Sequence, residues 1–144
     1  MNNLEAALRN LPHGPQFRFL DHLASLTPGV RGAGQYFVRG DEPFLQGHFP
    51  GHPLFPGVLL LEACAQLAGV VAQSDPAIPP LADLRLTAIR TAKILGSAIP
   101  GEVLRLEAEI NGRLGKLIQA EVRAYVGERL LLEGQLTLSG RSPG

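Results

Sequence analysis

The sequence predicts an α+β fold in which one curved antiparallel sheet wraps around one long buried helix. Apolar and polar residues alternate strictly through the last third of the chain, from Leu104 to Leu138, and this period of two is typical of half-buried strands. Residues 57–73 form the only long helical stretch, and a helix that is apolar on nearly all sides is buried. A chain of 144 residues suits one domain, which we expect to span residues 1–144.

Turn residues divide the first two thirds of the chain into shorter elements. Pro28-Gly29 separates two apolar stretches, and a run rich in proline and glycine precedes the long helix. Pro56 suits the start of that helix. We therefore expect, in order, a short amphipathic helix over residues 4–10, strands over 17–26 and 30–39, a loop over 41–56, the helix over 57–73, a turn over 75–80 and a strand over 84–95.

The alternating region divides into three further strands, over residues 104–110, 118–126 and 130–138. The links between them, around residues 111–115 and 127–128, are short and contain glycine. Such a pattern predicts an antiparallel meander with one apolar and one polar face.

The composition excludes several functional classes. The 13 basic and 13 acidic residues cancel and are scattered, so nothing indicates a nucleic-acid partner. No stretch approaches the roughly 20 apolar residues of a membrane span, and the N-terminus does not resemble a secretory signal. The single cysteine, Cys64, excludes an internal disulfide and fits a reducing compartment. We therefore expect a cytoplasmic protein that does not bind membranes.

The long helix carries one narrow polar stripe. Glu62, Gln66 and Gln73 fall within about 40° of one another at roughly 100° per residue. Burial disfavours the ionised form of a carboxyl group, so Glu62 is a candidate general acid at neutral pH. The alternative is a structural carboxyl that is hydrogen-bonded to Gln66 or to a partner chain, and the position alone does not separate the two.

Two more features point to proton transfer and carbonyl binding. His48, in the loop before the helix, is a candidate general base, although His52 lies close by and the sequence does not rank the two. Gly57 supplies one of the first helix N–H groups, which can stabilise charge on a carbonyl oxygen, or it simply begins a helix. Cys64 faces about 160° away from Glu62 and is expected in the core. Nothing matches a metal-site pattern, so we expect no metal.

The run from Glu42 to Gly69, EPFLQGHFPGHPLFPGVLLLEACAQLAG, closely resembles the signature of the 3-hydroxyacyl-acyl-carrier-protein dehydratases of the FabZ type. The segments from Leu11 to Leu23 and from Ala92 to Glu102 are similar to two flanking motifs of that family, and the likeness covers nearly the whole chain. It implies the hot-dog fold, which is the helix-in-sheet arrangement described above. It also implies dehydration of 3-hydroxyacyl thioesters to trans-2-enoyl thioesters, in fatty acid or related lipid or polyketide biosynthesis.

The resemblance assigns roles to individual residues. His48 matches the family's catalytic histidine and Glu62 its catalytic carboxylate. Gly57 matches the residue whose N–H holds the thioester carbonyl, and Gln66 matches a glutamine that lines the same site. In the related FabA type, which also isomerises the double bond, an aspartate stands at the position of Glu62, so glutamate here favours dehydration without isomerisation.

The resemblance also implies a substrate tunnel and partners. We expect Phe49, Phe55 and Val58 to line an apolar tunnel along the helix, and no cofactor to be needed. The expected partner is acyl carrier protein bearing the 3-hydroxyacyl group. The family works as a homodimer, in some members as a trimer of dimers, and each tunnel takes its histidine from one chain and its acid from the other.

The chain departs from the family pattern at two places. Pro15 and Gln16 stand where the family usually has a tyrosine and a proline, and Leu95 and Gly96 replace a basic pair that normally meets the acidic carrier protein. Lys93 is one residue that can compensate. Two alternative functions therefore stay open: a hot-dog acyl thioesterase, and a non-catalytic homologue that only binds acyl carriers.

Overall fold

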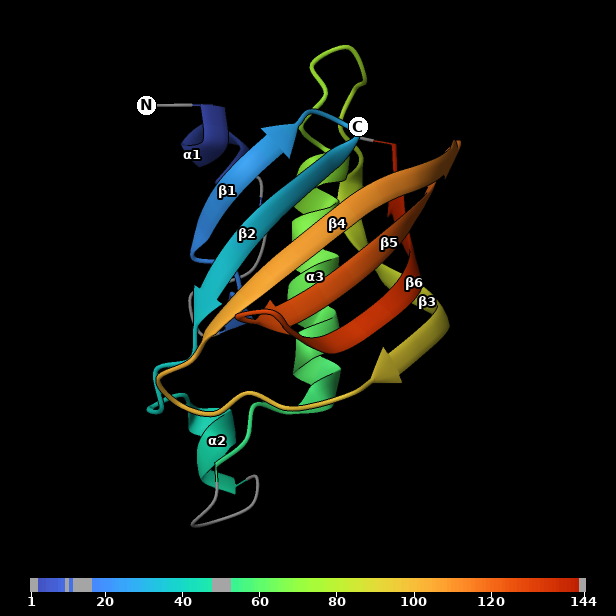
Figure 1. The fold of residues 1–144 in the computed structure, drawn as a ribbon. Coiled ribbons are helices and arrows are strands. Elements are labelled where there is room, and N and C mark those ends of the chain that lie inside the picture. The colour runs from blue at the N-terminus through green and yellow to red at the C-terminus, as the bar shows by residue number, and fades with distance from the viewer. Residues whose placement is uncertain (1–2, 10, 12–16, 48–52, 143–144) are drawn as a thin grey trace.

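The computed structural model describes residues 3–9, 11, 17–47 and 53–142, and it shows a six-stranded antiparallel sheet curved around one central helix (Figure 1). The strand order is β1-β2-β4-β5-β6-β3. The elements are α1 (Asn3–Leu8), β1 (His22–Thr27), β2 (Arg31–Phe37), α2 (Pro43–Gly47), α3 (Gly57–Ala72), β3 (Ala82–Ile94), β4 (Val103–Leu114), β5 (Leu117–Val126) and β6 (Arg129–Arg141). The predicted fold class is therefore confirmed.

The meander of β4, β5 and β6 is confirmed by its pairing and by its burial. β4 pairs with β5 and β5 pairs with β6, both antiparallel. The buried residues of β4 and β5 alternate with half-buried or exposed ones. Gly115 and Gly127, in the two connections, have φ angles of +60° and +59°, a region that glycine enters without steric penalty. The apolar face of the meander packs on α3, as the alternation predicts.

Two predictions differ most from the structure, the first for a long-range reason and the second for a local one. The strand expected over residues 17–26 begins only at His22, because residues 17–19 instead bond to the side chain of Gln66 on α3. The loop expected over 41–56 contains the short helix α2. Proline suits its first position, and the Leu45 N–H donates to the Glu42 carbonyl.

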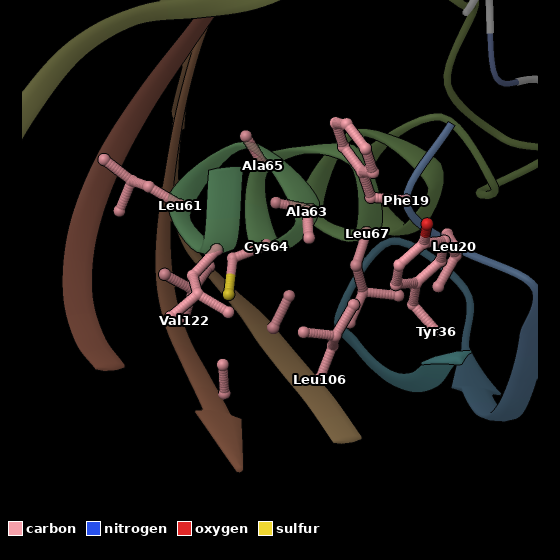
Figure 2. Close-up of a cluster of buried hydrophobic side chains, with 14 of the residues drawn as sticks. Phe19, Leu20, Tyr36, Leu61, Ala63, Cys64, Ala65, Leu67, Leu106 and Val122 are labelled. Carbon is pink, nitrogen blue, oxygen red and sulfur yellow. The ribbon is translucent and has the colours of Figure 1, made fainter. Parts of the chain in front are cut away.

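The core lies between α3 and the sheet. Eleven of the 16 residues of α3 are buried, and Figure 2 shows Cys64 on the side of the helix that faces Leu106 and Val122. At the other end from Gly57, an Arg113 guanidinium N–H donates to the Ala72 carbonyl at 2.7 Å. A cation there satisfies a terminal carbonyl and is favoured by the helix dipole. Arg113 thus holds the C-terminal end of α3.

Candidate active site

A cavity of about 140 Å³ lies along one face of α3. Its lining includes Glu62, Gln66, Gly69 and Gln73, which follow one another at spacings of four, three and four residues and so share one helix face. Most of the remaining lining comes from apolar side chains, among them Leu84 and Leu86 of β3 and Leu138 of β6. The polar stripe predicted from the sequence therefore faces a cavity, with the half-buried Glu62 as its carboxyl group.

Gln66 fixes one wall of this cavity. Its side chain is 2% exposed, its Oε1 accepts from the Phe19 N–H at 2.8 Å, and its Nε2 donates to the Phe17 carbonyl at 2.8 Å. An amide both donates and accepts, so it pairs with the chain as a neighbouring strand would. Gln66 lines the cavity, as expected, and also holds the 17–19 segment against α3. Its contact with substrate stays a prediction.

Gln73 holds a second chain segment against α3, also through both ends of its amide. Its Nε2 donates to the Leu81 carbonyl at 2.7 Å, and its Oε1 accepts from the Leu81 N–H at 3.1 Å. Leu81 directly precedes β3. The two glutamines thus attach two different chain segments to α3, one at each side of the cavity face.

The first turn of α3 leaves backbone N–H groups without a partner in the helix and packs closely against the end of β3. Pro56 has extended φ and ψ angles of −60° and 137°, and its carbonyl accepts from the Leu60 N–H. Gly57 and Val58 precede the first N–H groups bonded within the helix. A Cβ atom added at Gly57 would lie 2.8 Å from Cδ1 of Ile94, at the end of β3. Glycine therefore lets the end of β3 approach the first turn of the helix, where a carbonyl oxygen can be stabilised.

Phe55 is placed in the core. It is 1% exposed, and its ring meets those of Phe44, Phe19 and Tyr36 at centroid distances of 5.4, 5.7 and 5.8 Å. Its N–H donates to the Ala98 carbonyl at 2.8 Å. These contacts fix the chain just ahead of α3, while a role of Phe55 in lining the substrate tunnel stays a prediction.

A buried carboxylate that the sequence analysis missed anchors α2. Glu42 accepts from the Tyr36 hydroxyl at 2.6 Å, from the Arg39 N–H at 3.1 Å and from the Gly40 N–H at 2.6 Å. Burial raises the pKa of Glu42, but the hydrogen bonds outweigh it and the net pKa is lowered. The signal was its place directly after a glycine turn and before an apolar run. Glu42 thus secures the start of α2.

The candidate base lies in the part of the chain that the structure does not describe. His48, His52 and Phe49 all fall within residues 48–52, so their predicted roles stay predictions. His48 directly follows Gly47, the last residue of α2.

β3 forms an edge of the sheet and exposes apolar side chains. It pairs only with β6 within the described residues, and Ile89 and Ile94 are 50% and 53% exposed. Val58, expected to line the tunnel, is 72% exposed at the start of α3. Large apolar side chains beside an unpaired strand edge are typical of surfaces that pair with another chain.

Cys64 lies in the core and does not line the cavity. Burial raises the pKa of the Cys64 thiol to about 12, which leaves it protonated and unreactive at neutral pH.

Residues 3–9, 11, 17–47 and 53–142 contain no group of three or more histidine, cysteine or acidic side chains placed to hold a metal ion. The same residues form no helix long and apolar enough to cross a membrane.

Fold and site together define a hot-dog domain with a carboxyl group in a cavity beside its central helix. The model of the FabA-like domain family matches residues 11–135, and the chain belongs to this family. A protein of Alkaliphilus metalliredigens is 37% identical over 143 residues, which cover 99% of this chain and 96% of that protein. One of Moorella thermoacetica is 39% identical over 126 residues, 88% and 87% of the two chains. Both are named 3-hydroxyacyl-[acyl-carrier-protein] dehydratase FabZ.

Solved structures share the fold at lower sequence identity. A chain of the dehydratase heterocomplex ApeI:P from Xenorhabdus doucetiae superposes with a TM-score of 0.78 at 20% identity, over 96% of this chain and 91% of that one. The virulence protein Cj0977 from Campylobacter jejuni reaches 0.71 at 13% identity, over 96% and 95%. These similarities establish the hot-dog fold.

Proposed function

We propose that this protein dehydrates 3-hydroxyacyl thioesters carried by acyl carrier protein to trans-2-enoyl thioesters, in fatty acid biosynthesis or a related lipid or polyketide pathway. The observation that carries the proposal is the position of Glu62, a carboxyl group at a cavity along α3 whose lining includes the apolar side chains of Leu84, Leu86 and Leu138. The names of the curated relatives, which match over most of their length, support the same reaction.

The reaction needs one base, one acid and one carbonyl site. The acyl chain lies along α3, and the Gly57 N–H polarises the thioester carbonyl, which acidifies the C2–H bond. Neutral His48 removes the C2 proton while protonated Glu62 gives its proton to the C3 hydroxyl. The C3–O bond breaks, the C2–C3 double bond forms and water leaves. A second proton exchange returns His48 and Glu62 to their starting forms, so the reaction consumes no cofactor.

The assembly that we propose is a homodimer formed along β3. Pairing of two β3 edges covers the exposed apolar side chains of Ile89 and Ile94 and satisfies edge backbone groups. In such a dimer His48 of one chain and Glu62 of the other form each site, as the resemblance implies. A trimer of these dimers and a location in the cytoplasm stay predictions.

The first experiment follows the enoyl-thioester absorbance, with 3-hydroxybutyryl and longer 3-hydroxyacyl carrier proteins as substrates. Glu62→Gln keeps the shape of the side chain but cannot supply the proton, so we expect kcat to fall by roughly 10²–10⁴-fold with folding preserved. Glu128→Gln, in the exposed β5–β6 turn, is the matched control and should keep full activity. Near-wild-type turnover by Glu62→Gln would refute the acid assignment.

Two further measurements, of free thiol and of carrier-protein binding, separate the two alternative functions. Release of free thiol from an acyl thioester, without enoyl product, would identify a thioesterase. Binding of the acyl carrier protein without either product would identify a non-catalytic homologue. Either result would overturn the proposed dehydration.

Mixing two inactive variants tests the shared site. His48→Ala and Glu62→Gln homodimers each lack one group in both sites. A mixed dimer has one site with both groups intact if each site draws on two chains, so random exchange of subunits should restore about a quarter of wild-type activity. No recovery, with exchange verified by mass spectrometry, would mean that both groups come from one chain.

A further inference from the structure

Gly69 is a glycine in the interior of a helix with no conformational need for glycine. It lies in α3, between Gly57 and Ala72, and it is absent from the glycines with positive φ. Glycine in the middle of a helix is less stable than alanine, because it loses more backbone freedom on folding. The backbone of α3 therefore gives no reason for glycine at this position.

Packing gives no reason either. A Cβ atom added at Gly69 would meet only Cδ2 of Leu84, at 3.8 Å, which is ordinary van der Waals contact. Glycines elsewhere differ: at Gly32 the added Cβ would lie 2.8 Å from Val71, and at Gly34 it would lie 2.5 Å from Leu20. Those two glycines are needed for close approach of the chain, whereas Gly69 leaves space unfilled.

The unfilled space belongs to the cavity that contains Glu62. Gly69 lines that cavity, seven residues beyond Glu62 on the same helix face and about 10 Å farther along the helix axis at roughly 1.5 Å per residue. Around Gly69 the lining includes Val70 of α3 and Leu84 of β3, with Asp83 and Arg85 on either side of Leu84. Beyond Gly69 lies Gln73, whose amide is bonded to Leu81.

We propose that Gly69 sets the length of the acyl chain that the cavity accepts. The missing side chain leaves room for the carbons beyond C3 of a medium-chain substrate, while a short chain ends before reaching this turn of the helix. The identity of the ligand as an acyl chain rests on the proposed function. The substrate class that follows is the 3-hydroxyacyl thioesters of medium chain length.

The test compares two substrates in each variant. Gly69→Ala and Gly69→Leu are assayed with 3-hydroxybutyryl and 3-hydroxydecanoyl carrier proteins, and the measured quantity is the ratio of their kcat/KM values. We expect Gly69→Leu to lower the decanoyl-to-butyryl ratio at least 30-fold and Gly69→Ala to lower it less, by about two- to fivefold. Gln119→Leu, which adds the same side chain on the exposed face of β5, should leave the ratio unchanged.

The proposal is overturned if both substrates lose the same factor in Gly69→Leu, if the decanoyl substrate is unaffected, or if the wild type rejects it. Should Gly69→Leu fail to fold, Gly69→Ala carries the test, because alanine favours the helix and its Cβ meets no close neighbour. In that case, an unchanged decanoyl-to-butyryl ratio of kcat/KM in Gly69→Ala would overturn the proposal.

A binding measurement separates this proposal from the proposed function. Calorimetry gives the Kd of butyryl-pantetheine and decanoyl-pantetheine for the wild type and both variants. Loss of decanoyl preference in Gly69→Leu, in a protein that dehydrates nothing, would refute the dehydratase and support the length role of Gly69. Dehydration by a protein whose Kd values do not change with the residue at position 69 would support the dehydratase and refute the length role of Gly69.

Discussion

Replacing Gln66 by leucine tests whether its amide, rather than the bulk of its side chain, holds the cavity wall. Leucine has a similar size and suits a helix, so the helix and its packing are largely kept. The substitution removes the acceptor for the Phe19 N–H and the donor to the Phe17 carbonyl, both at 2.8 Å. Phe19 itself is 1% exposed, so water does not replace the lost acceptor easily.

The magnitude follows from these two contacts. A buried N–H without a partner costs about 1–3 kcal/mol, and the part-buried carbonyl loses a bond of net value about 0.5–1.5 kcal/mol. The greater apolarity of leucine offsets part of this loss. We expect Gln66→Leu to lower the free energy of unfolding by about 2–3 kcal/mol, which corresponds to about 7–10 °C in Tm for a domain of this size.

Urea unfolding at one fixed protein concentration measures the change, because dimerisation would make stability depend on concentration. The midpoint should fall with the slope m unchanged. Gln119→Leu, on the exposed face of β5, is the matched control and should shift stability by less than about 0.5 kcal/mol. A loss below about 1 kcal/mol for Gln66→Leu would show that the two hydrogen bonds do not hold the 17–19 segment.

Two further predictions concern titratable groups. Burial acts to raise the pKa of Glu42, but its hydrogen bonds lower it on balance. A folded-state pKa below the unfolded one stabilises the protein at neutral pH. This contribution is lost as pH falls through the folded-state pKa. The stability difference between wild type and Glu42→Gln, measured by urea unfolding, should therefore be larger at pH 7 than at pH 4, and an equal difference at both would contradict the lowered pKa. Burial raises the pKa of Cys64 to about 12, so the native protein should not react with a thiol reagent at pH 8 and should react once unfolded in urea; rapid reaction of the folded protein would contradict its position in the core.

The parts of the fold that the sequence predicted depend on local patterns. Strands β4, β5 and β6 follow from strict alternation, since a strand with one buried face repeats every two residues. α3 follows from its length and its apolar sides. Residues 17–19 fall in a stretch that is predicted as a strand because it is mostly apolar, yet the Phe19 N–H donates to Gln66, 47 positions away in the chain. No local pattern contains that partner.

The residues of the site also divide into those that a local sequence pattern predicts and those that it does not. The position of Glu62 and Gln66 on one helix face follows from a period of 3.6 residues, so their shared face was predictable. The carboxylate of Glu42 was missed because a glutamate beside a glycine turn is usually solvated. Its hydrogen bonds from Tyr36, Arg39 and Gly40 are seen only in the folded chain.

The three polar side chains of the α3 stripe differ in role according to what each can donate. Gln66 and Gln73 donate hydrogen bonds that hold the structure, whereas Glu62 is proposed to donate a proton to the substrate. Gln66 and Gln73 each accept from a backbone N–H and donate to a backbone carbonyl of another segment, which requires an amide, because an ionised carboxylate only accepts. Glutamate at either position would leave a carbonyl without its donor. At position 62 the requirement is opposite, because the proposed reaction needs a group that gives up a proton, and an amide does not do so near neutral pH. The order of glutamate and glutamine along one helix face therefore follows from chemistry, and exchanging the two residue types at positions 62 and 66 should lose turnover through the first change and stability through the second.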